Sequence, residues 1–227
     1  MEDFSVKDTT GGGRGFPVLD AGAYEAACGG ERRDAAESRR KVMDAARTLF
    51  AERGVEDVSM YEVGRAAGVG QGTLYRRYEH KGALCAALLH ERMGDFSEEV
   101  RNRLEKDGGP ALEQLEYLLV RLARFNEENA LLLGAIRDAA GGVRRFGMYR
   151  NPFYQWLRAT VSTLLEHGVK RCEITTVDVE YLSDATLAPL NIDLYLFQRH
   201  ELGMSPEQIT SSLTRLLLNG LRGDPQT

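Results

Sequence analysis

Apolar residues recur at helical spacing along most of the chain from residue 34 onward. One such stripe runs from Val42 to Phe50 and is ended by Gly54, and others begin near Lys81 and near residue 111. Apolar side chains three to four residues apart are typical of helices that bury one face. No stretch of strand length alternates apolar with polar residues. The pattern therefore predicts an all-α protein.

Glycine, proline and capping residues mark the helix boundaries in the second half of the chain. The sequence D-G-G-P at 107–110 predicts a break between two helices, and a loop is expected around residues 141–142. Asn151 before Pro152 predicts the start of a helix that ends at Gly168. Pro189 should kink or end the long helical pattern over 178–202. The sequence S-P-E-Q at 205–208 predicts a capping box at the start of a last helix.

Two short helices are predicted between residues 58 and 80. Ser59 followed three residues later by Glu62 is a capping box, and Val58 and Val63 stand at the positions of a hydrophobic staple around it. The first helix should end at Gly68, because glycine readily adopts the left-handed conformation that closes a helix. Only a tight turn then separates this helix from the next.

The second helix begins near Gln71 and has one packing face and one polar face. Leu74 and Tyr78 are four residues apart and share a face, whereas Arg76 and Arg77 point elsewhere. A helix pair of this kind can place its second helix in a major groove of DNA. From these residues alone, an ordinary helix pair with a solvated basic face is an equally good interpretation.

The run G-V-G-Q-G-T-L-Y-R-R-Y-E-H-K-G-A-L at 68–84 resembles a known family signature. It is similar to the DNA-binding signature of the TetR family of transcriptional repressors, which has the form G-V-S-x-G-T-L-Y-x-H-F-x-x-K-x-x-L. The sequence differs from this form at Gly70, Arg77 and Tyr78. The matching residues are Gly68, Val69, Gly72, Thr73, Leu74, Tyr75, Lys81 and Leu84.

The resemblance implies a domain organisation and a function. It implies a three-helix DNA-binding domain over residues 31–82 and an effector-binding and dimerisation domain over 83–227, preceded by a flexible arm over 1–30. The stretches Val179–Leu202 and Ser205–Leu221 match the two helices that form the dimer interface in the family. We therefore expect a repressor that binds palindromic operator DNA as a homodimer and is released by a small effector.

Residues expected to contact DNA lie on and after the second short helix. Glutamine and arginine match the edges of adenine and guanine, so Gln71 and Arg76 are expected at base edges or at the backbone. Gly72 would allow a close approach of the protein backbone to a phosphate. The expected phosphate contacts are Thr73, Tyr75, Arg77 and Lys81.

Aromatic side chains on the middle helices are candidates for an effector pocket. Together with one guanidinium and one carboxylate they could enclose a small aromatic or amphipathic molecule. The alternative is that aromatic residues at helical spacing simply form the core. The candidates are Phe96, Tyr117, Phe125, Arg137, Asp138, Phe153 and Trp156.

Composition and charge add limited support. The net charge is −5, but residues 31–92 carry 12 basic and 10 acidic side chains, a net +2 that has the right sign for phosphate contact. No signal peptide or membrane span is indicated, so a cytoplasmic protein is expected. The three cysteines are far apart and are expected to be reduced thiols.

No motif of a metal site, a cofactor site or a catalytic centre occurs in the sequence. We therefore expect neither a cofactor nor an enzyme activity. The main alternative function is a helical small-molecule-binding or protein-interaction module that does not bind DNA sequence-specifically. An enzyme whose catalytic residues meet only in three dimensions is the third possibility.

Overall fold

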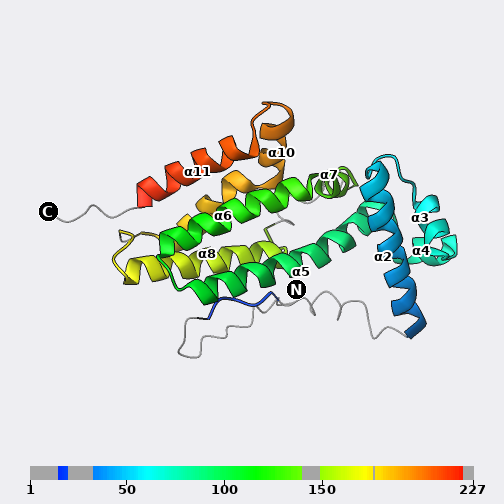
Figure 1. The fold of residues 1–227 in the computed structure, drawn as a ribbon, viewed down its shortest axis with the longest axis horizontal. Helices are drawn as coiled ribbons and strands as arrows, with labels where there is room; N and C mark the ends of the chain where they lie inside the picture. The colour runs from blue at the N-terminus through cyan, green and yellow to red at the C-terminus, as the bar shows by residue number, and fades with distance from the viewer. Residues whose placement is uncertain (1–14, 20–32, 140–148, 176, 222–227) are drawn as a thin grey trace. The chain divides into compact units, whose positions relative to one another are not determined.

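The computed structural model describes residues 15–19, 33–139, 149–175 and 177–221, and these are mostly helical (Figure 1). They contain no β-sheet, so the predicted all-α class is confirmed. None of their helices is both long enough and apolar enough to cross a membrane. In chain order the helices are α2 (Arg33–Arg53), α3 (Met60–Ala67), α4 (Gln71–Arg77), α5 (Lys81–Asp107), α6 (Ala111–Glu128), α7 (Ala130–Ala139), α8 (Pro152–Lys170), α9 (Val179–Leu187), the 3-10 helix η1 (Ala188–Leu190), α10 (Ile192–His200) and α11 (Pro206–Leu221).

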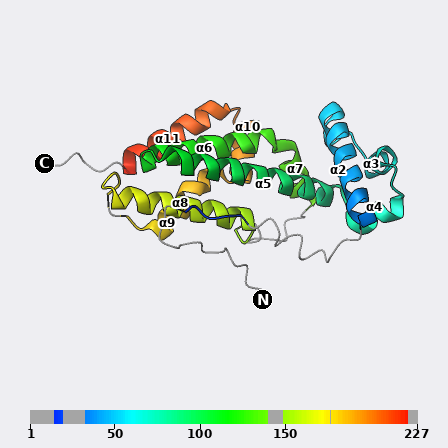
Figure 2. The ribbon, with the colours of Figure 1, turned by 60° about the horizontal axis from the view of Figure 1, so that its bottom comes forward.

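The described elements form two compact units. The helix-turn-helix unit contains α2, α3, α4, α5 through Gly94, and α7. The carboxyl-terminal unit contains the 15–19 segment, α5 from Asp95, α6, and α8 to α11. Within this second unit, α6 packs against α8 and α11, and α8 packs against α9 (Figures 1 and 2). The functional boundary expected at residues 82/83 stays a prediction.

An apolar core holds the helix-turn-helix unit together. Helix α7 contributes Leu132 to this core, although it follows α6 in the chain. A Cβ added to Gly82 at the start of α5 would lie 2.4 Å from the Ala139 Cβ, so glycine permits the close approach of α5 and α7. The core side chains of α2 to α5 are Val42, Met43, Ala46, Met60, Val63, Ala67, Leu74, Leu84, Cys85 and Leu88.

Both ends of α3 form as the sequence predicts. The Ser59 backbone N–H donates to Glu62 Oε2 at 2.8 Å, and the Glu62 N–H donates to Ser59 Oγ at 3.3 Å. Hydrogen bonds from the Ser59 backbone, and then from Arg53 and the Ser59 hydroxyl, lower the pKa of Glu62 to about 2. Gly68 closes the helix with a φ of 65°. The Glu62 carboxylate is therefore ionised throughout the neutral pH range, and the capping box stays formed there.

Helix α8 begins as predicted but ends later. Asn151 caps it by accepting a hydrogen bond from the Phe153 N–H at 2.8 Å. The expected end at Gly168 is wrong, because the helix continues to Lys170. A Cβ at Gly168 would lie 2.4 Å from Ile174 Cδ1, so this glycine makes room for a packed neighbour within the helix. Sequence alone does not distinguish a glycine needed for packing from one that ends a helix.

The predicted interruption at Pro189 and the last capping box are both present. The chain forms the short helix η1 between α9 and α10, and Asn126 of α6 donates to the Leu190 carbonyl at 2.9 Å. At the start of α11, the Ser205 N–H donates to Gln208 Oε1 at 2.8 Å, and the Gln208 N–H donates to Ser205 Oγ at 3.1 Å. The backbone of these turns is thus held by side chains close in sequence and by α6.

The 15–19 segment packs in the carboxyl-terminal unit. Phe16 is buried and meets the His167 ring edge-on, with ring centroids 6.0 Å apart. The Pro17 carbonyl accepts a hydrogen bond from Trp156 Nε1 at 2.9 Å. The rest of the arm expected over 1–30, and the loop expected at 141–142, lie outside the described residues. The packing of Phe16 was not anticipated, because one aromatic residue among glycines gives no periodic signal.

An ion-pair network between α6 and α10 predicts a pH dependence of stability. Hydrogen bonds from Arg199, and then from Tyr195, lower the pKa of Glu127 below its usual value, against the effect of burial. A carboxyl group with a lowered folded-state pKa stabilises the fold at pH values above its unfolded-state pKa of about 4.3. This contribution is lost as pH falls through the folded-state pKa.

We therefore expect Glu127→Gln to lower the urea midpoint of unfolding at pH 7, with a smaller difference from wild type below about pH 4. Circular dichroism at a series of pH values measures this. Glu128→Gln is the matched control, since the Glu128 carboxylate lies 3.6 Å from its only described partner, Arg121 Nη1. A Glu127→Gln effect that does not change with pH would contradict the assignment.

Candidate functional site

The turn between α3 and α4 sets the position of α4. The Val69 N–H donates to the Gly64 carbonyl at 3.0 Å, and the Leu74 N–H donates to the Gly70 carbonyl at 3.1 Å. Gly70 is extended and caps α4 without a side chain. Leu74 is the buried residue within α4, and it packs into the core shared by α2, α3 and α5. The opposite face of α4 is therefore open to solvent.

That open face contains four of the residues expected at DNA. Gly72, Thr73, Tyr75 and Arg76 are all exposed, whereas Arg77 is half-buried. Neither Arg65, in the last turn of α3, nor Arg76, in the last turn of α4, has an acidic partner among the described residues.

Two exposed tyrosines lie on the helix pair. Tyr75 of α4 is 48% exposed, and Tyr61 of α3 is 60% exposed. Tyr61 was missed by the sequence analysis, because the family signature begins only at Gly68. Tyr61 lies in the first turn of a capped helix, away from its apolar stripe. This position predicts an exposed side chain and could have identified Tyr61 from the sequence. A phenol hydroxyl on each helix can donate to a phosphate oxygen.

Gln71 is directed at α3. Its Nε2 donates to the Tyr61 carbonyl at 3.2 Å. A Cβ at Gly64 would lie 2.5 Å from the same nitrogen, so the glycine in α3 creates the space that this amide fills. In this position Gln71 fixes the first turn of α4 against α3. Its expected role at a base edge stays a prediction.

Lys81 also contacts the protein itself. Its Nζ donates to the carbonyls of Val55, Glu56 and Val58, at 2.7, 3.0 and 3.2 Å. An ammonium group has three donors, so these bonds use all of them. Lys81 thereby joins the start of α5 to the turn between α2 and α3. Its expected contact with a phosphate stays a prediction.

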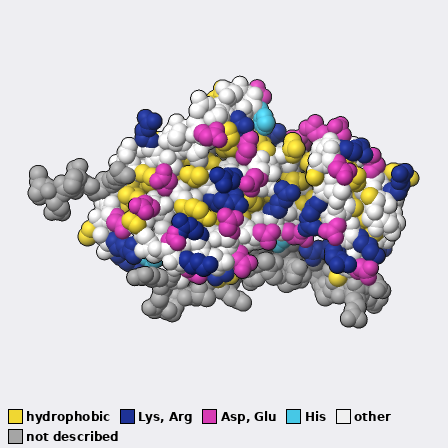
Figure 3. Space-filling model, in the orientation of Figure 1, with side chains coloured by type: hydrophobic (Ala, Val, Ile, Leu, Met, Phe, Trp, Pro, Cys, Tyr) yellow, Lys and Arg dark blue, Asp and Glu magenta, His cyan; other side chains and the backbone are white. Residues whose placement is uncertain are grey.

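The basic residues of α2 are largely paired with acids. Arg47 contacts Asp44 and Glu91, and Arg39 Nη2 lies 3.6 Å from Glu91 Oε1. Lys41 pairs with Glu37 at 2.8 Å. Figure 3 shows basic and acidic side chains interspersed over the visible face of the described residues. Among the described side chains of these helices, Arg65 of α3, Arg76 of α4 and the exposed Arg40 of α2 therefore carry positive charge that no acid pairs with.

Four of the expected effector residues lie together in the carboxyl-terminal unit. Phe96 and Phe125 have ring centroids 4.9 Å apart, and Phe153 stacks on Trp156 with centroids 5.8 Å apart. All four side chains are buried. In this structure they pack on one another, as a core cluster does. Their expected contact with an effector stays a prediction.

The other three candidates lie elsewhere. Tyr117 lies near the exposed edge of α6, with its hydroxyl 3.4 Å from Glu99 Oε1. Arg137 and Asp138 are exposed on α7, in the helix-turn-helix unit, and contact each other at 3.4 Å. This arginine and this carboxylate therefore belong to a different unit from the aromatic cluster.

A different guanidinium covers the cluster. Arg121 Cζ lies 5.1 Å from the centroid of the Phe96 ring. Its Nε and Nη2 donate to the two oxygens of Glu99, at 2.8 and 2.9 Å, and these bonds lower the pKa of Glu99. Sequence reasoning missed Arg121, although its spacing four residues after Tyr117 places both on one face of α6.

No group of His, Cys, Asp and Glu side chains that could hold a metal ion occurs in the described part of the chain. Cys85 is buried, and burial raises the pKa of its thiol to about 11. A thiol with so high a pKa is a poor nucleophile.

Comparisons with known proteins agree with this architecture. Residues 42–88 match the family model described as bacterial regulatory proteins, tetR family. A Staphylococcus aureus protein named as an HTH-type transcriptional regulator is 28% identical over 188 residues, which are 83% of this chain and 96% of that protein.

Two solved structures have a similar fold. A structure of RolR with the ligand resorcinol superposes with a TM-score of 0.60 and 20% identity, over 85% of this chain and 91% of that one. A SmeT–triclosan complex superposes with a TM-score of 0.57 and 16% identity, over 83% and 93% of the two chains. The all-helical arrangement is thus shared with proteins crystallised with small aromatic molecules.

The Lys81 contacts predict a loss of stability on substitution. Lys81→Met removes three hydrogen bonds from an ammonium group and leaves the carbonyl groups of the α2–α3 turn without this donor. We expect the free energy of unfolding to fall by about 1–3 kcal/mol. Urea unfolding followed by circular dichroism measures it, with Lys106→Met, an exposed lysine on the same helix, as the control. Equal stability of the two variants would show that the three contacts are unimportant.

Proposed function

Because the chain belongs to the TetR family of bacterial regulatory proteins, we propose that it is a ligand-responsive transcriptional repressor that binds palindromic operator DNA in the cytoplasm. The observation that carries this proposal is the exposed polar face of α4, held on a buried apolar face by α2, α3 and α5. A helix supported in this way can enter a major groove without rearranging its own domain.

Within this proposal, the exposed residues of α4 contact the DNA directly. Arg76 has no acidic partner among the described residues, so its guanidinium can pair with a guanine edge or with a phosphate. Thr73 and Tyr75 donate to phosphates, Gly72 allows a close backbone approach, and Arg77 adds positive charge. For Gln71 and Lys81 we propose a positioning role in place of the base-edge and phosphate contacts expected from the sequence, since both side chains are bonded to backbone carbonyls of the same unit.

Salt dependence distinguishes these two kinds of residue. Each phosphate contact of a Lys or Arg side chain that is lost should reduce the slope of log affinity against log salt by ~0.9, because the slope counts the phosphates that cationic side chains neutralise. We expect Arg76→Ala to weaken operator binding, and either to relax preference at one base pair or to reduce the slope. Tyr75→Phe should weaken binding similarly on all sequences. Lys81→Met should leave the slope unchanged.

The measurement uses an operator found by selection from genomic fragments, with Arg124→Ala on α6 as a control for a lost surface charge. If Tyr75→Phe and Arg76→Ala both bind like wild type, the assignment of α4 fails. If selection yields no preferred sequence, the alternative of a helical ligand-binding or protein-interaction module is favoured.

The last helices support a homodimer. Leu194 and Phe197 of α10, Leu202 after it, and Leu216 of α11 are all exposed, at 41%, 50%, 58% and 73%. Several exposed apolar side chains on two consecutive helices favour a surface that another protein covers. A two-fold dimer would present two copies of α4 to half-sites about 34–36 Å apart on DNA.

We expect a dimer in size-exclusion chromatography with light scattering, with twice the 25.3 kDa mass of the chain. Phe197→Glu should shift it toward the monomer, because the charge would be buried in the interface. Leu131→Glu is the control, since Leu131 is 60% exposed but lies on α7. A monomer mass for the wild-type protein at every concentration would rule the dimer out.

The effector is proposed to act in the carboxyl-terminal unit. Support comes from the aromatic cluster of Phe96, Phe125, Phe153 and Trp156, and from the aromatic ligands named for the similar RolR and SmeT structures. Helix α5 belongs to both units and begins at Lys81, shortly after α4. In a dimer, a ligand that shifts α5 would therefore change the separation of the two copies of α4. A coupling free energy of ~1–3 kcal/mol would suffice to change operator occupancy.

A further inference from the structure

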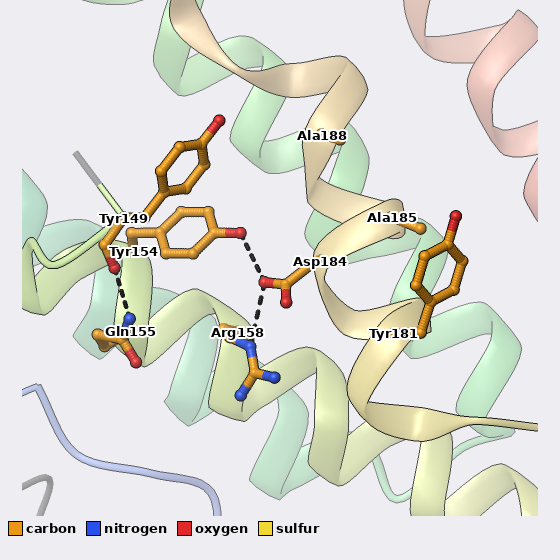
Figure 4. Close-up of a pocket in the computed structure, with 8 residues that line it drawn as sticks. All are labelled: Tyr149, Tyr154, Gln155, Arg158, Tyr181, Asp184, Ala185 and Ala188. Atoms are coloured by element: carbon orange, nitrogen blue, oxygen red, sulfur yellow. Dashed lines mark hydrogen bonds and ion pairs between the residues drawn. The ribbon is translucent and has the colours of Figure 1, made fainter. Parts of the chain in front are cut away.

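An open groove lies between α8 and α9, outside the aromatic cluster (Figure 4). Its volume is about 460 Å³, which is within the range of small-molecule sites. Residues 154 and 158 lie four apart on α8, and residues 181, 184, 185 and 188 recur at helical spacing along α9 and η1, so two continuous faces form the walls. The residues that matter for binding are Tyr149, Tyr154, Arg158, Tyr181, Asp184 and Ala185.

The groove has one carboxylate oxygen that is still available. Asp184 Oδ1 accepts from the Tyr154 hydroxyl at 2.7 Å and from Arg158 Nε at 3.0 Å. Figure 4 shows the Asp184 side chain reaching from α9 toward these two residues of α8. The second oxygen, Oδ2, accepts no hydrogen bond among the described residues. Asp184 is therefore held in place by one oxygen and can bind a ligand with the other.

The local charge favours a cation. Arg158 is the one basic residue of the groove lining, and it is shared between Asp184 and Glu180, whose Oε2 accepts from Nη2 at 2.5 Å. Two carboxylates therefore meet one guanidinium, which leaves one negative charge in excess. An anion would have to approach the two carboxylates and compete with them for Arg158.

The walls suit an aromatic or alkylated cation. Tyr149 packs edge-on against Tyr154, with centroids 5.2 Å apart, and is itself 42% exposed. Tyr181 is 71% exposed at the other side of the lining. Ala185 adds a small apolar side chain to the lining. Tyrosine rings attract organic cations through their negative faces, and they bury apolar groups as well.

From these contacts we propose that the groove is a binding site for a small aromatic organic cation, with its ammonium group at Asp184 and its ring against Tyr181. The site does not depend on the proposed repressor function, because it rests only on residues of the carboxyl-terminal unit. Binding and DNA release are separate measurements, so failure of one does not decide the other.

Isothermal titration of the full-length protein with benzyltrimethylammonium tests the charge preference. The uncharged benzyl alcohol and the anionic benzoate serve as matched probes with the same ring. We expect the cation to bind at least about tenfold more tightly than either. Equal binding of the cation and the alcohol, or tighter binding of benzoate, would overturn the proposal.

Substitutions then locate the site. Asp184→Asn should weaken cation binding at least about fivefold, whereas Asp44→Asn, an exposed aspartate of α2 paired with an arginine, should not. Tyr181→Leu should weaken binding and Tyr181→Phe should retain it, because phenylalanine keeps the ring face.

Tyr181 is exposed, so its variants should fold even if Asp184→Asn does not, and circular dichroism checks this. Cation binding that is unchanged in both Asp184→Asn and Tyr181→Leu would place the cation elsewhere.

Discussion

The position of α4 depends on its contacts with the neighbouring helices. The helix has seven residues and a single fully buried side chain, Leu74, and so short a helix is unstable in isolation. Its neighbours therefore determine its orientation. Gln71 fixes its first turn to α3, and Tyr78 directly after it donates to Met43 Sδ at 3.6 Å. Lys81 then ties the following helix to the α2–α3 turn. These contacts cover the other side of α4. Only its exposed face therefore remains accessible to a binding partner.

The carboxyl-terminal unit contains two different aromatic arrangements. The four rings of the cluster that contains Phe96 pack against one another, and Arg121, paired with Glu99, lies over the Phe96 ring. A ligand could enter there only by moving side chains, at a cost in packing. The groove between α8 and α9 is open in the same structure and needs no such change. One unit can thus combine a closed core with an accessible surface site.

Local signals in the sequence predicted most of the fold. Capping boxes at Ser59 and Ser205, the asparagine before Pro152 and the break at Pro189 all act within a few residues, so they can be read along the chain. The packing of Gly168 against Ile174 could not be predicted, since it depends on how the chain returns after α8.

For the candidate sites too, local features could be predicted from the sequence and tertiary contacts could not. The exposed face of α4 follows from the helical period of a known signature, and the structure places Thr73, Tyr75 and Arg76 on it. Whether a side chain such as Lys81 faces solvent or a neighbouring carbonyl is a tertiary property. The same holds for Arg137, which appeared close to the middle helices in sequence but belongs to the helix-turn-helix unit.

The route of the chain through its two units limits how the protein can be dissected. Starting from the 15–19 segment, the described chain passes from one unit to the other four times before α8 to α11 complete the carboxyl-terminal unit. A fragment cut within α5 would lack α7, and with it Leu132 from the core around α4. A deletion of the first 19 residues would remove Phe16 and the acceptor of the Trp156 indole. Chimaeras should therefore exchange discontinuous segments.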